Sequence, residues 1–180
     1  SLVCCIQKKE QEGKDMKKEQ KITLVLLIIY LTILTWIILL KTNFSFSALG
    51  HYRSVNLIPF AGSVVINGKV DLDEILNNFI VFIPVGLYLG MLMPKSSPLR
   101  KIAPIFGLSL LYEVIQFIFA IGASDITDLI MNTLGGAAGI FLVFLITKLL
   151  KEKTVKILNI AAVICTLAIT GFMALLIGVN

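Results

Sequence analysis

The feature that most constrains this chain is the apolar run ITLVLLIIYLTILTWIILL at residues 22–40, which contains no charged side chain. A bilayer core about 30 Å thick needs about 20 apolar residues to cross it as a helix, so this run has the length of a membrane span. A cleaved signal peptide is the alternative, but the run is too long for one and FSFSA at residues 44–48 is a poor cleavage site.

Four further apolar segments are present, at residues 75–93, 102–121, 129–150 and 157–177. The composition agrees with them, because 57% of the residues are hydrophobic and 15% are charged, whereas a soluble domain carries about 25% charged residues. We therefore predict an all-α, polytopic membrane helix bundle with about five transmembrane helices and one long loop, residues 41–74, on the outer side.

Lysine and arginine placement predicts the orientation. Thirteen of the sixteen basic residues lie in the N-terminal tail, the 94–101 turn and the 148–156 turn, so the positive-inside rule puts the N-terminus in the cytoplasm and the C-terminus outside. This distribution accounts for the net charge of +5 through contact with anionic lipid, and no nucleic acid is expected as a partner.

Three regions are expected along the chain: a cytoplasmic tail at 1–21, a membrane domain at 22–150, and a cytoplasmic turn with a fifth helix at 151–180. Residues 1–15 differ in character from the rest of the chain, and Met16-Lys17-Lys18 is typical of a bacterial start, so we expect 1–15 to be non-native or an extended start. One histidine and three cysteines provide no metal-ligand set, and no cofactor is expected. Cys165 lies in an apolar run and is expected to be a small buried residue.

The segment SDITDLIMNTLGG, residues 124–136, brings polar side chains to the start of the fourth apolar segment. If it is helical, one face carries both its acids, its asparagine and nearby glycines, namely Asp125, Asp128, Asn132, Gly135, Gly136 and Gly139. Glycines at this spacing let a neighbouring helix approach closely. The alternative is a capping box, in which Asp125 caps the helix and Asp128 reaches back to its backbone.

The third apolar segment contains Glu113 and Gln116, which share a helix face with Ser109. We expect Glu113 to lie eight residues below the outer end of the helix, about 12 Å into the membrane. A carboxylate there costs on the order of 2.5–3.5 kcal/mol, so it should face the interior of the bundle and have a partner. A neutral glutamate bonded to an amide of a neighbouring helix is the structural alternative.

The second segment and the outer loop add further polar groups on the same side. Asn78 lies near the outer end of its segment, and Pro84 and Gly86 interrupt the middle, although a kink and simple packing would also explain these three residues. The loop contributes Arg53 and Asn56, and Arg53 is the best outer-side cation for the acids unless it is merely solvated. Together these residues predict a polar pocket open to the outside.

Four motifs occur in the order found in VanZ-like membrane proteins: RSVNLIPF from residue 53, NNFIVFIPVG from 77, SLLYEVIQ from 109 and SDITDLIMNTLGG from 124. The resemblance covers nearly half the chain. It implies an integral membrane protein of bacterial, mostly Gram-positive, cell envelopes and an association with resistance to the glycopeptide teicoplanin. The residues that it singles out are Arg53, Asn56, Pro59, Phe60, Asn78, Pro84, Gly86, Glu113, Gln116, Asp125, Asp128, Asn132 and Gly135. Many relatives have an arginine just before the paired aspartates, where this chain has Ala123-Ser124.

The functions compatible with these observations fall into different classes. The first is a multi-pass protein of the bacterial cell membrane that binds a cell-wall precursor lipid or a lipophilic glycopeptide through Arg53, Asn56, Asn78, Glu113, Gln116, Asp125, Asp128 and Asn132. The second is a membrane-embedded enzyme with Glu113 or Asp128 as the acid or base. The third is a small proton-coupled transporter or flippase, which the missing internal repeat disfavours unless the protein forms a homo-oligomer. The bilayer is the one partner common to all three.

Overall fold

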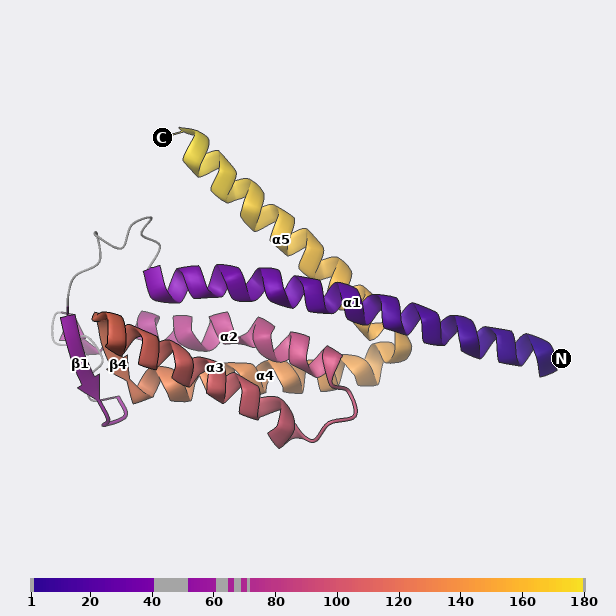
Figure 1. Ribbon diagram of the computed structural model, residues 1–180, viewed down its shortest axis with the longest axis horizontal. Coiled ribbons are helices and arrows are strands. Elements are labelled where there is room, and N and C mark those ends of the chain that lie inside the picture. The colour runs from indigo at the N-terminus through magenta and orange to yellow at the C-terminus, as the bar shows by residue number, and fades with distance from the viewer. Residues whose placement is uncertain (1, 41–51, 61–64, 67–68, 71, 180) are drawn as a thin grey trace.

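The computed structural model describes residues 2–40, 52–60, 65–66, 69–70 and 72–179. Side chains are described for residues 17–39, 55–60, 73, 75–120, 124–168 and 170–171. The described chain contains five α-helices: α1 Leu2–Leu40, α2 Leu72–Leu92, α3 Pro98–Phe119, α4 Ile126–Leu150 and α5 Thr154–Val179 (Figure 1). The short helix η2, Lys151–Lys153, separates α4 from α5.

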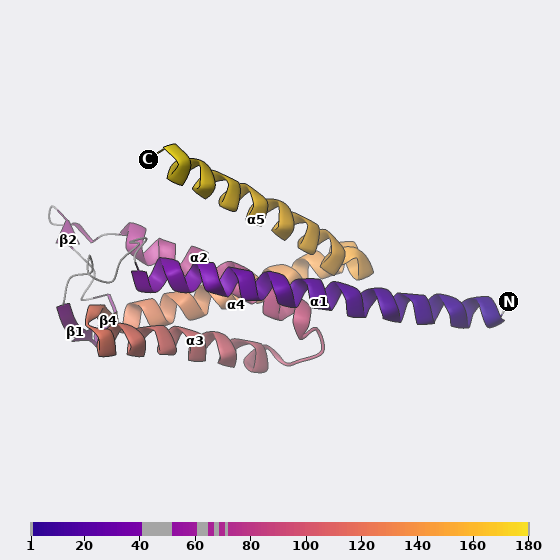
Figure 2. The same ribbon diagram turned by 45° about the horizontal axis from the view of Figure 1, so that its top comes forward.

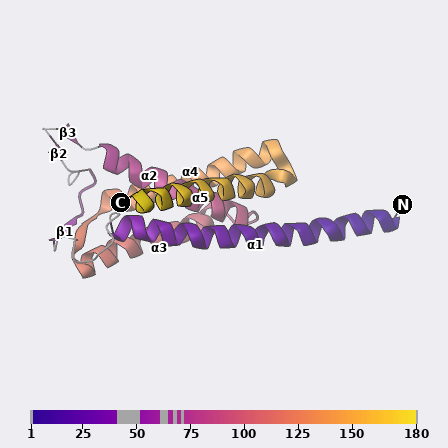
Figure 3. The ribbon, with the colours of Figure 1, turned by 90° about the horizontal axis from the view of Figure 1, so that it is seen from above.

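Helices α1 to α4 run side by side (Figures 1 and 3). Helix α5 leaves the bundle at an angle (Figures 1 and 2). The strands lie at one end, where α1 and α3 finish and α2 and α4 begin (Figure 2). We call this the sheet end. The opposite end contains the turn between α2 and α3 together with η2, and we call it the basic end because its lysines and arginine are Lys95, Arg100, Lys101, Lys148, Lys151, Lys153 and Lys156.

The helices confirm the expected membrane bundle, but the number of apolar stretches differs from five. Among the described residues, four helical stretches are long and apolar enough to cross a membrane, at Lys17–Leu39, Ile75–Leu92, Pro98–Phe119 and Ile126–Ala168. The last one includes α4, η2 and the first half of α5. The predicted fourth and fifth spans correspond to α4 and α5, two helices joined at η2, where the chain turns back toward the sheet end (Figure 1).

Glycines create the closest contact in the bundle, between α2 and α4. A Cβ added to Gly135 would overlap the carbonyl oxygen of Phe79, and one added to Gly139 would overlap that of Ile83. Gly86 of α2 lies in the same way against the carbonyl of Gly136. Backbone thus touches backbone along this interface, as is common where small residues let membrane helices approach closely.

The α1 helix is attached to α2 and α3 by apolar packing and by two tyrosine hydroxyls. Leu34 of α1 packs in a buried cluster with Phe82 of α2 and Tyr112 of α3. Tyr30 donates from its hydroxyl to the Val81 carbonyl, at 2.7 Å, and so connects α1 to α2. Thr35 and Tyr112 share a hydrogen bond of 2.8 Å between α1 and α3.

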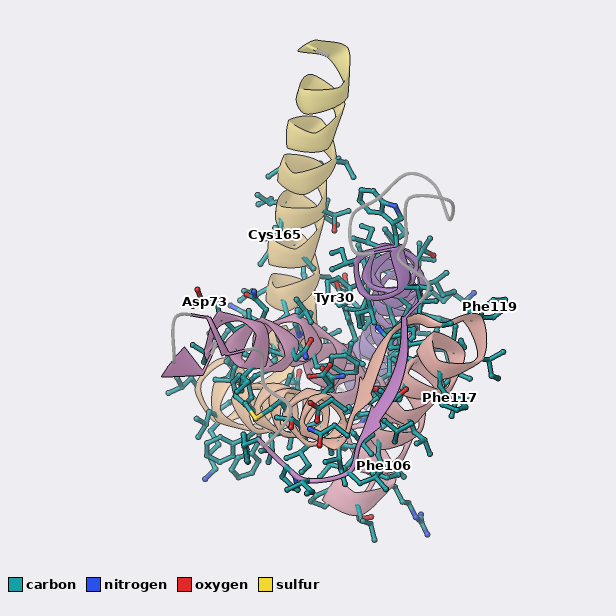
Figure 4. All side chains as sticks on the ribbon, turned by 90° about the vertical axis from the view of Figure 1, so that its left-hand side faces the viewer. Tyr30, Asp73, Phe106, Phe117, Phe119 and Cys165 are labelled. Carbon is teal, nitrogen blue, oxygen red and sulfur yellow. The ribbon has the colours of Figure 1, made fainter. Side chains whose placement is uncertain are left out.

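The α5 helix is held at its base by a buried amide. Asn159 is 2% exposed and donates to the carboxylate of Glu19, at 2.9 Å, while the hydroxyl of Thr23 donates to its side-chain oxygen, also at 2.9 Å. Farther along, α5 diverges from the bundle, and Cys165 is exposed on it (Figure 4). The expectation that Cys165 is buried was therefore wrong, because a lipid-facing helix keeps its apolar side chains on the outside.

Short strands, which the sequence did not predict, complete the sheet end. β1, Tyr52–Asn56, pairs in parallel with β4, Ile121–Asp125, so that Asn56 lies opposite Asp125. β2, Val65–Ile66, pairs antiparallel with β3, Lys69–Val70. Ala120 ends α3 in the left-handed conformation, with φ 54°, and this reversal directs β4 back along the end of α3.

Candidate functional site

The β1–β4 pair positions the first part of the candidate site. Asn56 donates from its amide to one carboxylate oxygen of Asp125, at 3.0 Å, and its own oxygen accepts from the N–H of Ile58, at 3.2 Å. The other carboxylate oxygen of Asp125 accepts from the N–H of Thr127, at 2.7 Å. Asp125 is therefore the N-cap of α4, and its carboxylate also joins the two strands through Asn56.

Glu113 of α3 lies next to Asp125. Its side chain is 8% exposed, and Oε2 accepts from the backbone N–H of Asp125, at 2.9 Å. The Ser124 hydroxyl donates to the Glu113 carbonyl, at 2.8 Å. In the capping-box alternative, Asp128 would accept from the backbone N–H of Asp125. In the structure, the carboxylate of Glu113 from α3 accepts from that N–H instead.

Glu113 is shallower than expected from the sequence. Because α3 ends at Phe119, six residues separate it from the end of the helix, or about 9 Å rather than 12 Å. The expectation failed because the segment was extended to residue 121, whereas residues from 121 onward are in β4. The return of β4 along α3 brings a backbone donor down to the carboxylate, which reduces the cost of burying it.

The charges around Glu113 are negative among the residues whose side chains are described. Asp128 and Asp125 both lie within electrostatic range of its carboxylate and repel it. Arg53, the cation expected to pair with these acids, is opposite Gly122 in the β1–β4 register, and its side chain lies outside the described residues. His51 also lies outside them.

A second polar contact lies deeper between α3 and α4. Asn132 is 3% exposed and donates to the hydroxyl of Ser109, at 2.9 Å. Its oxygen has no hydrogen-bond partner among the described residues. An unpaired buried acceptor costs about 1–3 kcal/mol, and such groups in native structures call for an explanation.

Gln116 bonds to α1, although the sequence predicted it in a shared polar pocket with Glu113. Its side chain is 6% exposed and donates to the carbonyl of Ile38 in α1, at 3.3 Å. Its oxygen, like that of Asn132, has no partner among the described residues. Gln116 thus connects α3 to α1, whereas Glu113, one turn earlier, connects α3 to β4.

Two residues of the site were not predicted from the sequence. Thr127 is 2% exposed, and its hydroxyl accepts from the N–H of Phe60, at 2.9 Å. Phe60 itself has φ 62°, so the chain after β1 turns sharply at this bond, next to the exposed Pro59. Ser124 is the other unpredicted residue. Ser124 precedes the N-cap residue Asp125 and Thr127 follows two residues after it. Small hydroxyl residues are common around an N-cap, and this pattern is the signal that could have identified them.

Asn78 remains apart from this cluster. It is half-buried near the start of α2, and none of the hydrogen bonds between described residues joins it to Glu113, Asp125 or Asn132. Three acids, Glu113, Asp125 and Asp128, therefore lie together with Asn56 of β1. Asn132 forms a separate contact with Ser109, and the contribution expected from α2 is limited to its glycine and proline positions.

A groove opens beside Glu113, between α3, α4 and β1, with a volume of about 290 Å³. Its walls are mainly apolar, and Glu113, Asp125, Asn56 and Ser124 form the polar part; the apolar lining residues are Val55, Leu57, Leu110, Val114, Phe117, Ile126 and Leu129. Phe117 is labelled in Figure 4, on the outer surface of α3 with Phe106 and Phe119. Among residues with described side chains, no three His, Cys, Asp or Glu groups are arranged to hold a metal ion.

A family model named VanZ/LLP1 matches residues 27–151, more than half of the chain. The chain belongs to the VanZ/LLP1 family. Protein VanZ from Enterococcus faecium is 42% identical over 130 residues, which are 71% of this chain and 77% of that protein. No solved structure matches. The protein is therefore a VanZ-like membrane protein, as the four motifs indicated, and the segment matched by the VanZ/LLP1 model contains the whole cluster around Glu113.

Proposed function

We propose that this protein is a multi-pass protein of the bacterial cell membrane that binds a lipid-linked cell-wall precursor or an acylated glycopeptide in the groove beside Glu113. By doing so it contributes to teicoplanin-like resistance or to envelope homeostasis. The observation that carries the proposal is the combination of a mainly apolar groove with a buried carboxylate at its polar side.

The apolar walls favour a ligand with an alkyl or prenyl chain. Leu110, Val114 and Phe117 line the groove from α3 and remain 43%, 44% and 40% exposed. They lie on a helix whose outward surface faces lipid, so a chain already dissolved in the bilayer can enter from the side. Covering these side chains with a ligand gains little over lipid contact, so shape and the polar group must supply specificity.

The polar side of the groove favours a ligand with hydrogen-bond donor groups. Glu113 and Asp125 both line it, and Asp128 adds a further negative charge nearby. Hydroxyl, amide or ammonium groups of a ligand can donate hydrogen bonds to these carboxyl oxygens. We therefore infer that the sugar or peptide part of the ligand contacts Glu113.

The side of the membrane is inferred from the charges at the two ends. Seven lysines and arginines lie at the basic end of the bundle, which the positive-inside rule assigns to the cytoplasm. The groove is at the sheet end and would then open toward the outer leaflet, where cell-wall precursors and glycopeptides meet the membrane.

A matched pair of tryptophan substitutions tests the groove. Leu110 lines it and Leu111 does not, although both are leucines on α3 with 43% and 51% exposure. Leu110→Trp should fill the groove and reduce teicoplanin protection to that of cells without the protein, whereas Leu111→Trp should keep wild-type protection. The readouts are growth inhibition in a susceptible Gram-positive host and binding of teicoplanin by the purified protein. Equal protection by the two variants, at equal expression, would exclude the groove.

The carboxylate is tested by Glu113→Gln. Glutamine keeps an oxygen for the N–H of Asp125, so the fold should persist while the ionisable carboxyl group is removed. Weaker binding of teicoplanin, or of a photoreactive polyprenyl-linked disaccharide, with an unchanged melting temperature would support the proposal. Unchanged binding of both probes would contradict the role given to Glu113.

A further inference from the structure

A second cavity lies at the basic end, far from the groove beside Glu113. It has a volume of about 530 Å³, which is within the range of ligand pockets in proteins. Its lining comes from the end of α2, the turn before α3, the start of α3 and the last turns of α4. Lys101 in this lining is twelve residues from Glu113 along α3, or about 18 Å.

The walls of this cavity match an acyl chain. Ile140, Phe141 and Phe144 of α4 lie on one side and Ile102 of α3 on another. Phe141 and Phe144 are 57% and 52% exposed, so the apolar wall continues onto the lipid-facing surface of α4. A hydrocarbon chain can therefore extend from the cavity into the bilayer without leaving apolar surroundings.

The polar groups of the cavity are cationic or hydroxyl groups. Lys101 lines it and is half-buried, and Ser96 lines it from the turn. Lys148 is not a lining residue, but its Nζ lies 4.4 Å from the ring centroid of Phe144, which is one. No acidic residue lines the cavity, and no ion pair joins either lysine to another residue with a described side chain. Two ammonium groups therefore adjoin an apolar cavity that supplies no counter-charge.

We propose that this cavity binds one anionic phospholipid, with the phosphate between Lys101 and Lys148 and an acyl chain against Ile140 and Phe141. Basic pockets between membrane helices on the cytoplasmic side bind anionic headgroups in this way. The proposal is independent of the ligand at the sheet end, because the two cavities share no lining residue.

The role of Lys101 and Lys148 is tested by native mass spectrometry of the full chain in detergent. The probes are the anionic lipid dioleoylphosphatidylglycerol and the zwitterionic lipid dioleoylphosphatidylcholine. The wild type should retain the anionic lipid preferentially. The double variant Lys101→Gln/Lys148→Gln should weaken its retention about 25-fold, since each lysine near an anionic lipid contributes about fivefold. The control Lys153→Gln/Lys156→Gln removes the same charge from exposed positions outside the cavity and should retain the lipid as the wild type does.

Either of two results would overturn the proposal: equal retention of the two lipids by the wild type, or equal losses in the two double variants. The cavity itself is tested by two adjacent half-buried alanines of α4, because Ala137 lines it and Ala138 does not. Ala137→Leu should reduce lipid retention and Ala138→Leu should not, with thermal unfolding used to verify that both variants are folded. Retention that is unchanged in Ala137→Leu would also contradict the proposed position of the acyl chain.

Discussion

The contact between α2 and α4 leads to a sharp prediction for the substitution Gly135→Ala. The added methyl group would overlap the carbonyl oxygen and carbon of Phe79. These are backbone atoms inside α2, so they cannot rotate away as the end of a side chain can. The two helices must move apart, and the neighbouring contact of Gly139 with the Ile83 carbonyl is then lost as well.

The size of the effect is set by two opposing contributions. Alanine is about 1 kcal/mol more favourable than glycine in a helix. Inserting a methyl group into a well-packed core usually costs about 1–3 kcal/mol, and the upper limit applies here because the obstacle is backbone. Gly135→Ala should therefore destabilise the protein by about 2 kcal/mol, which corresponds to a decrease in melting temperature of about 4–8 °C for a chain of this size.

Gly107→Ala is the matched control. It is also a glycine within a helix, but nothing lies within 4 Å of an added Cβ. Only the higher helix propensity of alanine then changes the free energy of unfolding, which should rise by up to about 1 kcal/mol. Both variants are measured by thermal unfolding of purified protein in the same detergent. If Gly135→Ala melts at or above the temperature of Gly107→Ala, the close contact between α2 and α4 is not present.

Three other substitutions should separate the kinds of interaction in the bundle. Glu113→Ala leaves the N–H of Asp125 unpaired and should cost about 1–3 kcal/mol in thermal unfolding, whereas Glu113→Gln should cost less; equal losses would contradict the hydrogen bond. Asn159→Leu removes the hydrogen bonds between α5 and α1 and should raise the protease sensitivity of α5 while residues 27–151 stay protected. Phe82→Ala empties a position that is 0% exposed and should cost about 3–5 kcal/mol, while Phe106→Ala, at 45% exposure, should change the melting temperature little.

The sequence was informative where the membrane imposes the pattern. A helix that crosses lipid must be apolar over its full length, so the helices could be recognised as runs of residues. Burial of an acid in lipid is costly enough that Glu113 had to be directed inward, and in the structure it lies beneath Asp125. Both inferences rest on large free energies and need no knowledge of the contacts.

The pairing of distant segments could not be predicted in the same way. Asn56 and Asp125 are 69 residues apart and meet in a parallel ladder, which no local pattern specifies because both strands are only five residues long. Gln116 shares a helix face with Glu113, yet it binds α1. A helix face about 100° wide can contact two neighbours, so periodicity alone cannot assign a partner.

The hydrogen bonds at the sheet end also decide which substitutions can report on ligand binding. Both carboxylate oxygens of Asp125 and its N–H are used within the fold, and so is the amide of Asn56. Loss of resistance after substitution of either residue would therefore result from loss of the cap and the strand pair. Glu113→Gln differs, because it preserves the acceptor for Asp125 and replaces only the carboxyl group beside the groove. A binding defect in that variant, with normal stability, would separate recognition from folding at this site.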